Sequence, residues 1–171
     1  EVKKDLWVVS TSGGTDPCTG FVGGCPLLPV NAGEIQCRCL GVKAEAFDGA
    51  GNPLLDQVGE LVITEPMPSM PLYLWNDFEN KRYVDSYFTM YPGVWRHGDW
   101  FKIKPNGSAV IAGRSDSTLN RFGVRFGSGE IYGVVEDIPE VLESLILGFE
   151  PPKGGYYMPL FVVLQPGITF D

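Results

Sequence analysis

Short apolar runs bounded by glycine, proline, asparagine or aspartate fill the chain from residue 6 to about residue 113. Runs of this kind between turn residues are typical of β-strands. Turn residues at 48–52 and 105–107 predict hairpin turns. This part of the chain is therefore expected to be mostly β. We predict strands at residues 6–9, 35–40, 42–47, 61–64, 100–103 and 109–111.

The pattern of apolar residues changes after Gly113. A short strand is predicted at 124–126, and two more at 145–149 and 160–164. Between them, residues 130–141 have apolar side chains at helical spacing, which predicts a helix. This apolar face consists of Ile131, Val134, Val135 and Ile138. The segment is expected to form a small α+β unit.

The two patterns together predict an α+β fold class with a boundary at residue 115. A chain of 171 residues is long enough for one or two domains. Its hydrophobic share of 44% and charged share of 20% are ordinary for a globular protein, so a core can form. We therefore expect a β-rich part at 1–115 and a smaller unit at 116–171.

The formal net charge is −8 at pH 7, and the chain has no basic stripe. Nucleic-acid binding is disfavoured, because affinity for the phosphate backbone requires clustered lysine and arginine. No apolar stretch is long enough to cross a bilayer, and residues 1–4 do not lead into a signal-peptide core. We expect a cytoplasmic protein without a membrane partner.

Four cysteines lie in the first part of the chain, at Cys18, Cys25, Cys37 and Cys39. Their spacing matches neither a paired zinc motif nor a dense disulfide framework. Cys37 and Cys39 alternate with polar residues, so we expect them on one buried face of a strand. Reduced structural thiols are the prediction for all of them.

Two segments on either side of residue 105 carry the strongest chemical signal. Residues 113–130 combine Arg114 and Arg125 with an acid and several glycines on a strand-to-helix passage, which directs cations and N–H groups at phosphate. Residues 95–100 read Trp-Arg-His-Gly-Asp-Trp, which places a carboxylate directly after glycine. Asp99 can therefore accept hydrogen bonds from two adjacent hydroxyls, such as those of a ribose.

In this order, the two segments resemble motifs of the adenylate-forming acyl-CoA synthetase superfamily. Residues 10–16 and 123–128 most resemble the members that activate acetoacetate. The resemblance implies that 1–115 is the mostly β end of a large AMP-binding domain, joined by a hinge to the start of a small mobile domain at 116–171. The family's lysine-ending phosphate loop and late catalytic lysine are missing, so we expect an internal piece of a longer enzyme.

The resemblance implies roles for residues 13–16 in activating the acid. Gly14 and Thr15 contact the adenylate phosphate, and Asp16, where relatives usually have glutamate, helps to hold Mg²⁺. Acetyl-specific relatives have tryptophan at the place of Gly13, so glycine there implies an acyl pocket with room for a four-carbon oxoacid. The residues alone leave open that 13–16 is an Asx-type turn without a ligand.

Further roles implied by the resemblance lie near the predicted boundary. Asp99 and Arg114 bind the ribose, and Arg125 binds phosphates during adenylation. Asp116 is the hinge residue, and Gly123 lies beside the path of the CoA arm. The alternatives are that Asp99 is a turn residue without a ligand and that Arg114 and Arg125 are ordinary surface arginines.

The function implied is that of an ATP-dependent acid–thiol ligase. Its substrates are acetoacetate, ATP and CoA, its ion is Mg²⁺, and its products form through acetoacetyl-AMP. His97 is expected to position other groups, because the family has an uncharged residue there and needs no histidine for acid–base chemistry. Two alternatives stay open: a ligase for acetate, propionate or butyrate, and a catalytically inert piece that binds nucleotide.

Overall fold

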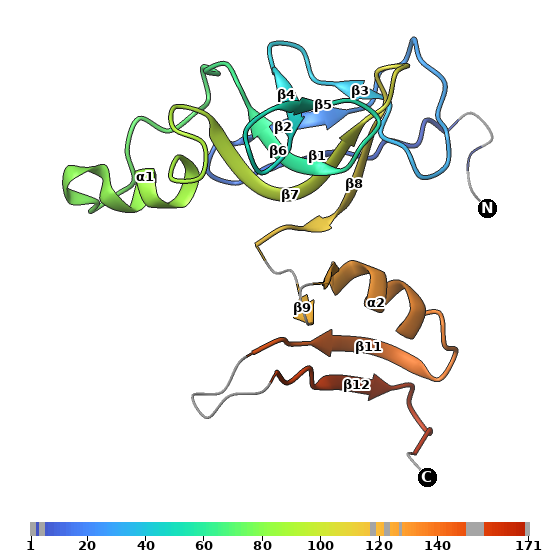
Figure 1. Cartoon of the computed structure of the whole chain (residues 1–171). Coiled ribbons are helices and arrows are strands. Elements are labelled where there is room, and N and C mark those ends of the chain that lie inside the picture. The colour runs from blue at the N-terminus through green and yellow to red at the C-terminus, as the bar shows by residue number, and fades with distance from the viewer. Residues whose placement is uncertain are drawn as a thin grey trace. The chain divides into compact units, whose positions relative to one another are not determined.

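The computed structural model describes residues 3, 6–116, 119–121, 124–126, 128–149 and 156–169. Strands outnumber helices in this part of the chain, which confirms the mostly β, α+β fold class. The chain divides into two compact units, Glu1–Ile111 and Ala112–Asp171 (Figure 1). Each unit has its own sheets and is described separately.

A five-stranded sheet with the order β5-β4-β6-β7-β8 forms the centre of the first unit. β6 pairs antiparallel with β4 on one side and with β7 on the other, and all of its residues are buried. The strands are β4 (Ala44–Phe47), β5 (Pro53–Leu54), β6 (Gly59–Ile63), β7 (Trp95–Ile103) and β8 (Ala109–Arg114).

A smaller antiparallel sheet packs on the first through a shared core. It consists of β1 (Ser12–Gly14), β2 (Thr19–Gly23) and β3 (Cys37–Arg38), in that order. Phe21 of β2 is fully buried in one cluster with Leu61 and Trp95 of the larger sheet. This packing brings the β1–β2 hairpin to β7, which carries residues 95–100.

A helical segment lies beside β7 (Figure 1). It consists of the 3₁₀ turn η1 (Phe78–Asn80) and helix α1 (Lys81–Tyr87). Asp77 accepts the N–H groups of Arg82 and Tyr83, both at 2.9 Å, which satisfies donors that have no partner within the helix. Tyr87 stacks on Trp95 with ring centroids 3.6 Å apart, so the helix is anchored to the strand.

The second unit contains a helix between two antiparallel strand pairs. The hairpin of β9 (Leu119–Arg121) and β10 (Val124–Phe126) precedes α2 (Ser128–Val135). Helix α2 packs on β11 (Val141–Ile146), and β11 pairs with β12 (Leu160–Leu164) (Figure 1). Glu136, just after the helix, accepts the N–H and the hydroxyl of Ser144 at 3.1 and 2.9 Å. These contacts tie the end of α2 to β11.

Most of the strand predictions are confirmed. Strands occur at 44–47, 59–63, 95–103, 109–114, 124–126 and 160–164. Both predicted turns are present: Asp48 accepts the N–H groups of Ala50 and Asn52 at 2.8 and 2.9 Å, and the Gly107 N–H bonds the Lys104 carbonyl at 2.9 Å. Local turn chemistry was therefore sufficient to locate these hairpins.

Three strand predictions need correction. Residues 6–9 are exposed and form no strand with any described residue. The strand expected at 35–40 is limited to Cys37–Arg38, with an isolated bridge from Ile35 to Ala109. The strand expected at 145–149 is β11, which runs earlier, from Val141 to Ile146. An apolar run becomes a strand only where a neighbouring strand pairs with it.

The predicted helix at 130–141 is also too long, because α2 ends at Val135. Pro139 cannot donate a backbone hydrogen bond and disfavours helix for the residue before it. Several elements were missed entirely, namely β1, β2, β5, β9, η1 and α1. In β2, Gly20 and Gly23 interrupt the apolar run, and α1 has a polar first turn.

All four cysteines are free, in agreement with the prediction of thiols. Cys37 and Cys39 are half-buried, but only Cys37 lies within β3, so their placement on one strand was wrong. Burial raises the pKa of the Cys37 thiol. Within the described residues, no helix is long and apolar enough to cross a membrane.

Candidate functional site

The β1–β2 hairpin presents Thr15 and Asp16 at its turn. The Cys18 N–H donates to the Thr15 carbonyl at 3.0 Å and closes the turn, and Pro17 inside it is buried. Both Thr15 and Asp16 are exposed. The Asp16 carboxylate accepts a hydrogen bond from the Tyr87 hydroxyl on α1. A helix that the sequence did not predict thus orients the expected metal-binding carboxylate.

The two glycines before this turn leave room for neighbouring groups. A Cβ on Gly14 would lie 2.7 Å from the His97 ring and 2.9 Å from Pro17. Cβ atoms in proteins essentially never lie this close to another heavy atom. A Cβ on Gly13 would overlap the Thr19 carbonyl oxygen and lie 2.7 Å from the Gly20 Cα. Both positions therefore require glycine for packing. The acyl-pocket role of Gly13 stays a prediction.

Residues 97–99 form a bulge in β7. Arg96 pairs with Val62 and Trp100 pairs with Glu60, so 97–99 lie opposite Leu61 alone. Bulges of this kind redirect side chains and are common beside active sites. Gly98 has φ +88°, a conformation that favours glycine. Asp99 lies in this bulge and is 6% exposed.

His97 joins the two motifs. Its Nε2 lies 3.0 Å from the Gly13 carbonyl oxygen, to which the Nε2–H tautomer donates, and 3.7 Å from Oδ2 of Asp99. The His97 ring also packs edge-on against Phe21 at 4.6 Å. The hairpin with Thr15 and Asp16 is thereby fixed next to the strand with Asp99. This geometry supports the positioning role expected for His97.

Glu60 of β6 supports the bulge from inside the sheet. Its Oε1 accepts the Gly98 N–H at 2.9 Å, and its Oε2 lies 3.2 Å from Nε of Arg96. Sequence reasoning missed both Glu60 and Tyr87 as parts of the site. A signal existed for Glu60, since it is a charged residue beside an otherwise apolar strand.

The remaining predicted residues belong to the region around and after the unit boundary. Arg114 and Asp116 form a bidentate ion pair, in which Nε of Arg114 donates to Oδ1 of Asp116 at 2.9 Å and Nη2 contacts Oδ2. Arg125 lies on β10 opposite Asn120 of β9. Gly123 is outside the described residues. The predicted site residues thus form one described cluster in the first unit and a second set near or within the other unit.

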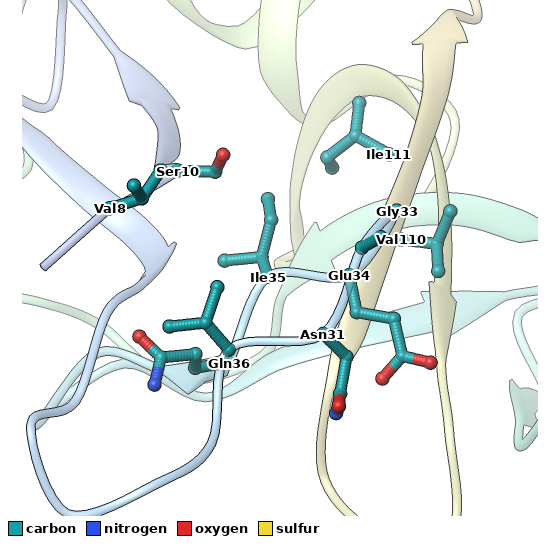
Figure 2. A pocket seen from close by; sticks show the side chains of 11 residues that line it. Val8, Ser10, Asn31, Gly33, Glu34, Ile35, Gln36, Val110 and Ile111 are labelled. Atoms are coloured by element: carbon teal, nitrogen blue, oxygen red, sulfur yellow. The ribbon is translucent and has the colours of Figure 1, made fainter. Parts of the chain in front are cut away.

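A cavity of about 340 Å³ in the first unit contains none of the predicted site residues (Figure 2). Its wall includes Ser10, Glu34 and Gln36, with apolar side chains around them. Glu34 is engaged by Lys104 and by the Ser108 hydroxyl at 2.6 Å, and these hydrogen bonds lower its pKa. The polar groups of this cavity therefore serve to connect segments of the unit.

Comparison with known proteins first defines the class. No family model matches the chain. The fold is that of CoA ligases: a benzoate CoA ligase from Burkholderia xenovorans is 27% identical with a TM-score of 0.69 over 95% of this chain and 31% of its own. Acetoacetyl-CoA synthetase from Streptomyces lividans is 57% identical, with a TM-score of 0.87 over 98% of this chain and 25% of its own.

Sequence comparison agrees. Acetoacetyl-CoA synthetase from Rattus norvegicus is 45% identical over 171 residues, which are 99% of this chain and 25% of the relative. The chain is therefore similar, over nearly all of its length, to one part of the acetoacetyl-CoA synthetases. It spans about a quarter of the length of each of these relatives.

Proposed function

We propose that this chain is part of an acid–thiol ligase that converts acetoacetate to acetoacetyl-CoA at the expense of ATP. The observation that carries the proposal is the contact of His97 with both Gly13 and Asp99, which unites the phosphate and ribose motifs in one site. The 57% identity to a synthetase with acetoacetate as its acid supports the choice of substrate.

The chemistry proceeds in two steps. A carboxylate is a poor electrophile, so the acid first attacks the α-phosphate of ATP and forms an acyl-adenylate with release of pyrophosphate. The CoA thiol, losing its proton, then attacks the acyl carbon and displaces AMP. The residues of this chain act by positioning substrates and by offsetting phosphate charge, and none of them is a covalent nucleophile.

In this proposal Asp99 binds the ribose. Its carboxylate accepts hydrogen bonds from the 2′ and 3′ hydroxyls, and its limited exposure strengthens these charge-assisted bonds. The bulge in β7 directs it, and His97 holds it against β1. Arg114 contributes a second contact to the ribose.

Thr15 and Gly14 contact the α-phosphate, and Asp16 is the residue that would hold Mg²⁺. The Asp16 carboxylate is a hard oxygen donor on an exposed turn, which fits Mg²⁺ when phosphate oxygens complete the coordination. Within the part of the chain that the structure describes, no three potential ligands lie together. The ion supplies positive charge that offsets the phosphates.

The second unit serves both half-reactions. In the proposal, 1–115 ends the large AMP-binding domain and 116–171 begins a small mobile domain that rotates about Asp116. Arg125 faces the phosphates during adenylation. Gly123 leaves room for the pantetheine arm of CoA during thioester formation.

Pyrophosphate exchange by the complete protein tests this function. Exchange with acetoacetate, followed by thioester formation with CoA, is the expected result. Faster exchange with acetate, propionate or butyrate would change the proposed acid substrate but would still support a ligase. ATP binding without exchange for any of these acids would contradict the ligase and favour a nucleotide-binding protein.

A further inference from the structure

A carboxylate is buried in the central strand of the five-stranded sheet. Glu60 is 3% exposed, and every residue of its strand, β6, is buried. Such burial is unfavourable unless hydrogen bonds and an opposite charge replace the lost water. The partners of Glu60 therefore indicate what the carboxylate does.

Both oxygens of Glu60 contact β7. Oε1 accepts the Gly98 N–H at 2.9 Å, and Oε2 lies 3.2 Å from Nε of Arg96. The Arg96 side chain is 26% exposed, so it reaches the buried carboxylate from the surface. Arg96 and Gly98 flank His97, and the carboxylate therefore spans the start of the bulge.

The bulge depends on this contact for its orientation. Gly98 has φ +88° and lies where β7 is out of register with β6, so the pairing of the sheet does not determine how its peptide is turned. The bond from the Gly98 N–H to Glu60 restrains this peptide instead. Asp99 follows directly and is 6% exposed, so a rotation of this peptide moves a carboxylate that has little free space.

We propose that Glu60 is a positioning residue of the nucleotide site, which holds the Gly98 N–H and so directs the Asp99 carboxylate at the ribose hydroxyls. The inference rests on the proposed function, in which Asp99 binds the ribose. Glu60 itself contacts no substrate. The competing interpretation is that Glu60 only stabilises the sheet, and its loss then weakens the binding of every nucleotide equally.

Calorimetric titration of ATP and of 2′,3′-dideoxy-ATP into the complete protein separates these interpretations. Glu60→Gln keeps the size of the side chain, but its NH2 group cannot accept a hydrogen bond, so the contact with Gly98 or the contact with Arg96 is lost. We expect it to weaken ATP binding about tenfold and to change dideoxy-ATP binding by less than about twofold, because the analogue has no hydroxyls to bind. An equal loss for both nucleotides would overturn the inference.

Glu60→Asp is a second variant, which keeps the test decisive if Glu60→Gln does not fold. It keeps the buried charge but is too short to reach the Gly98 N–H, so the same ATP-selective loss is expected. Glu45→Gln, on the neighbouring strand β4 opposite Val62, is the matched control and should bind both nucleotides as the unchanged protein does. If Glu60→Asp binds ATP normally, the inference is wrong.

Asp99→Asn distinguishes failure of the inference from failure of the proposed function. If Asp99→Asn loses ATP affinity, and combining it with Glu60→Gln adds little further loss, the two residues act as one unit. If Asp99→Asn loses affinity but Glu60→Gln does not, only the inference fails. If Asp99→Asn binds ATP normally, the ribose site itself is wrong and the inference falls with it.

Discussion

At Gly14 the site has no room for a side chain. A Cβ there would lie 2.7 Å from the His97 ring and 2.9 Å from Pro17, so β1 and β7 must separate to admit it. His97 is the contact between the two motifs, and displacing it disturbs Asp99 as well. Glycine at this position is therefore required by the packing of β1 against β7.

Gly14→Ala is expected to destabilise the β1–β2 hairpin by about 1–3 kcal/mol, the usual effect of overpacking, and to slow acetoacetate-dependent pyrophosphate exchange. Hydrogen exchange of peptides covering residues 12–23 in the complete protein measures the first effect. Gly49→Ala is the control, because no atom lies within 4 Å of a Cβ at that position. Unchanged protection in Gly14→Ala would show that β1 tolerates the added methyl.

Elements of the first unit are connected by a polar cluster at the β7–β8 hairpin. Lys104 and Ser108 bind Glu34, next to the bridge in which Ile35 and Ala109 exchange two backbone hydrogen bonds of 2.8 Å. Hydrogen bonding to Lys104 lowers the pKa of Glu34 below its ordinary value of 4.5 and raises the pKa of Lys104. The ionised pair thus connects the segment before β3 to β8.

Protection of the Ile35 and Ala109 amides is expected to depend on pH through this cluster. Because the Glu34 pKa is lowered in the folded state, its contribution is complete above pH 4.5 and is lost as pH falls through the folded-state pKa. Glu34→Gln should remove this dependence, while Glu65→Gln, at the exposed pair with Lys43, should keep it. Hydrogen exchange, corrected for intrinsic rates, measures the protection of these amides at each pH. Protection that still depends on pH in Glu34→Gln would contradict the role given to Glu34.

The whole molecule divides into two units, and the predicted functions divide with them. Of the residues predicted to bind nucleotide, Gly14, Thr15 and Asp99 lie in the first unit, whereas Arg114 and Arg125 lie in the second. Arg114 and Asp116 form their ion pair at this boundary. We propose that the second unit presents different residues to the substrates in the two half-reactions.

Arg125→Ala in the complete protein is expected to lower acyl-adenylate formation by about ten- to a hundredfold, because a charge-assisted contact to phosphate is lost. Gly123→Leu should leave adenylate formation intact and block transfer to CoA. Pyrophosphate exchange measures the first step and thioester formation the overall reaction. Identical defects in both variants would contradict this division of roles.

The sequence by itself determined the elements that depend on interactions between residues close together in the chain. Asp48 and the residues after it make a turn with their own hydrogen bonds, and the apolar runs of β4, β6 and β8 lie between such turns. The motif residues were likewise recognisable from residue types at fixed spacing. Helix α2 was recognisable too, although Pro139 ended it earlier than its apolar pattern suggested.

Tertiary structure alone decided how the site is held together. The contact of His97 with Gly13 joins residues 84 positions apart, that of Tyr87 with Asp16 joins residues 71 apart, and that of Glu60 with Gly98 joins residues 38 apart. Each depends on which strands pair and in what register, and the bulge at 97–99 exists only relative to β6. Spacing along one chain contains no record of that register, because it results from packing of the shared core.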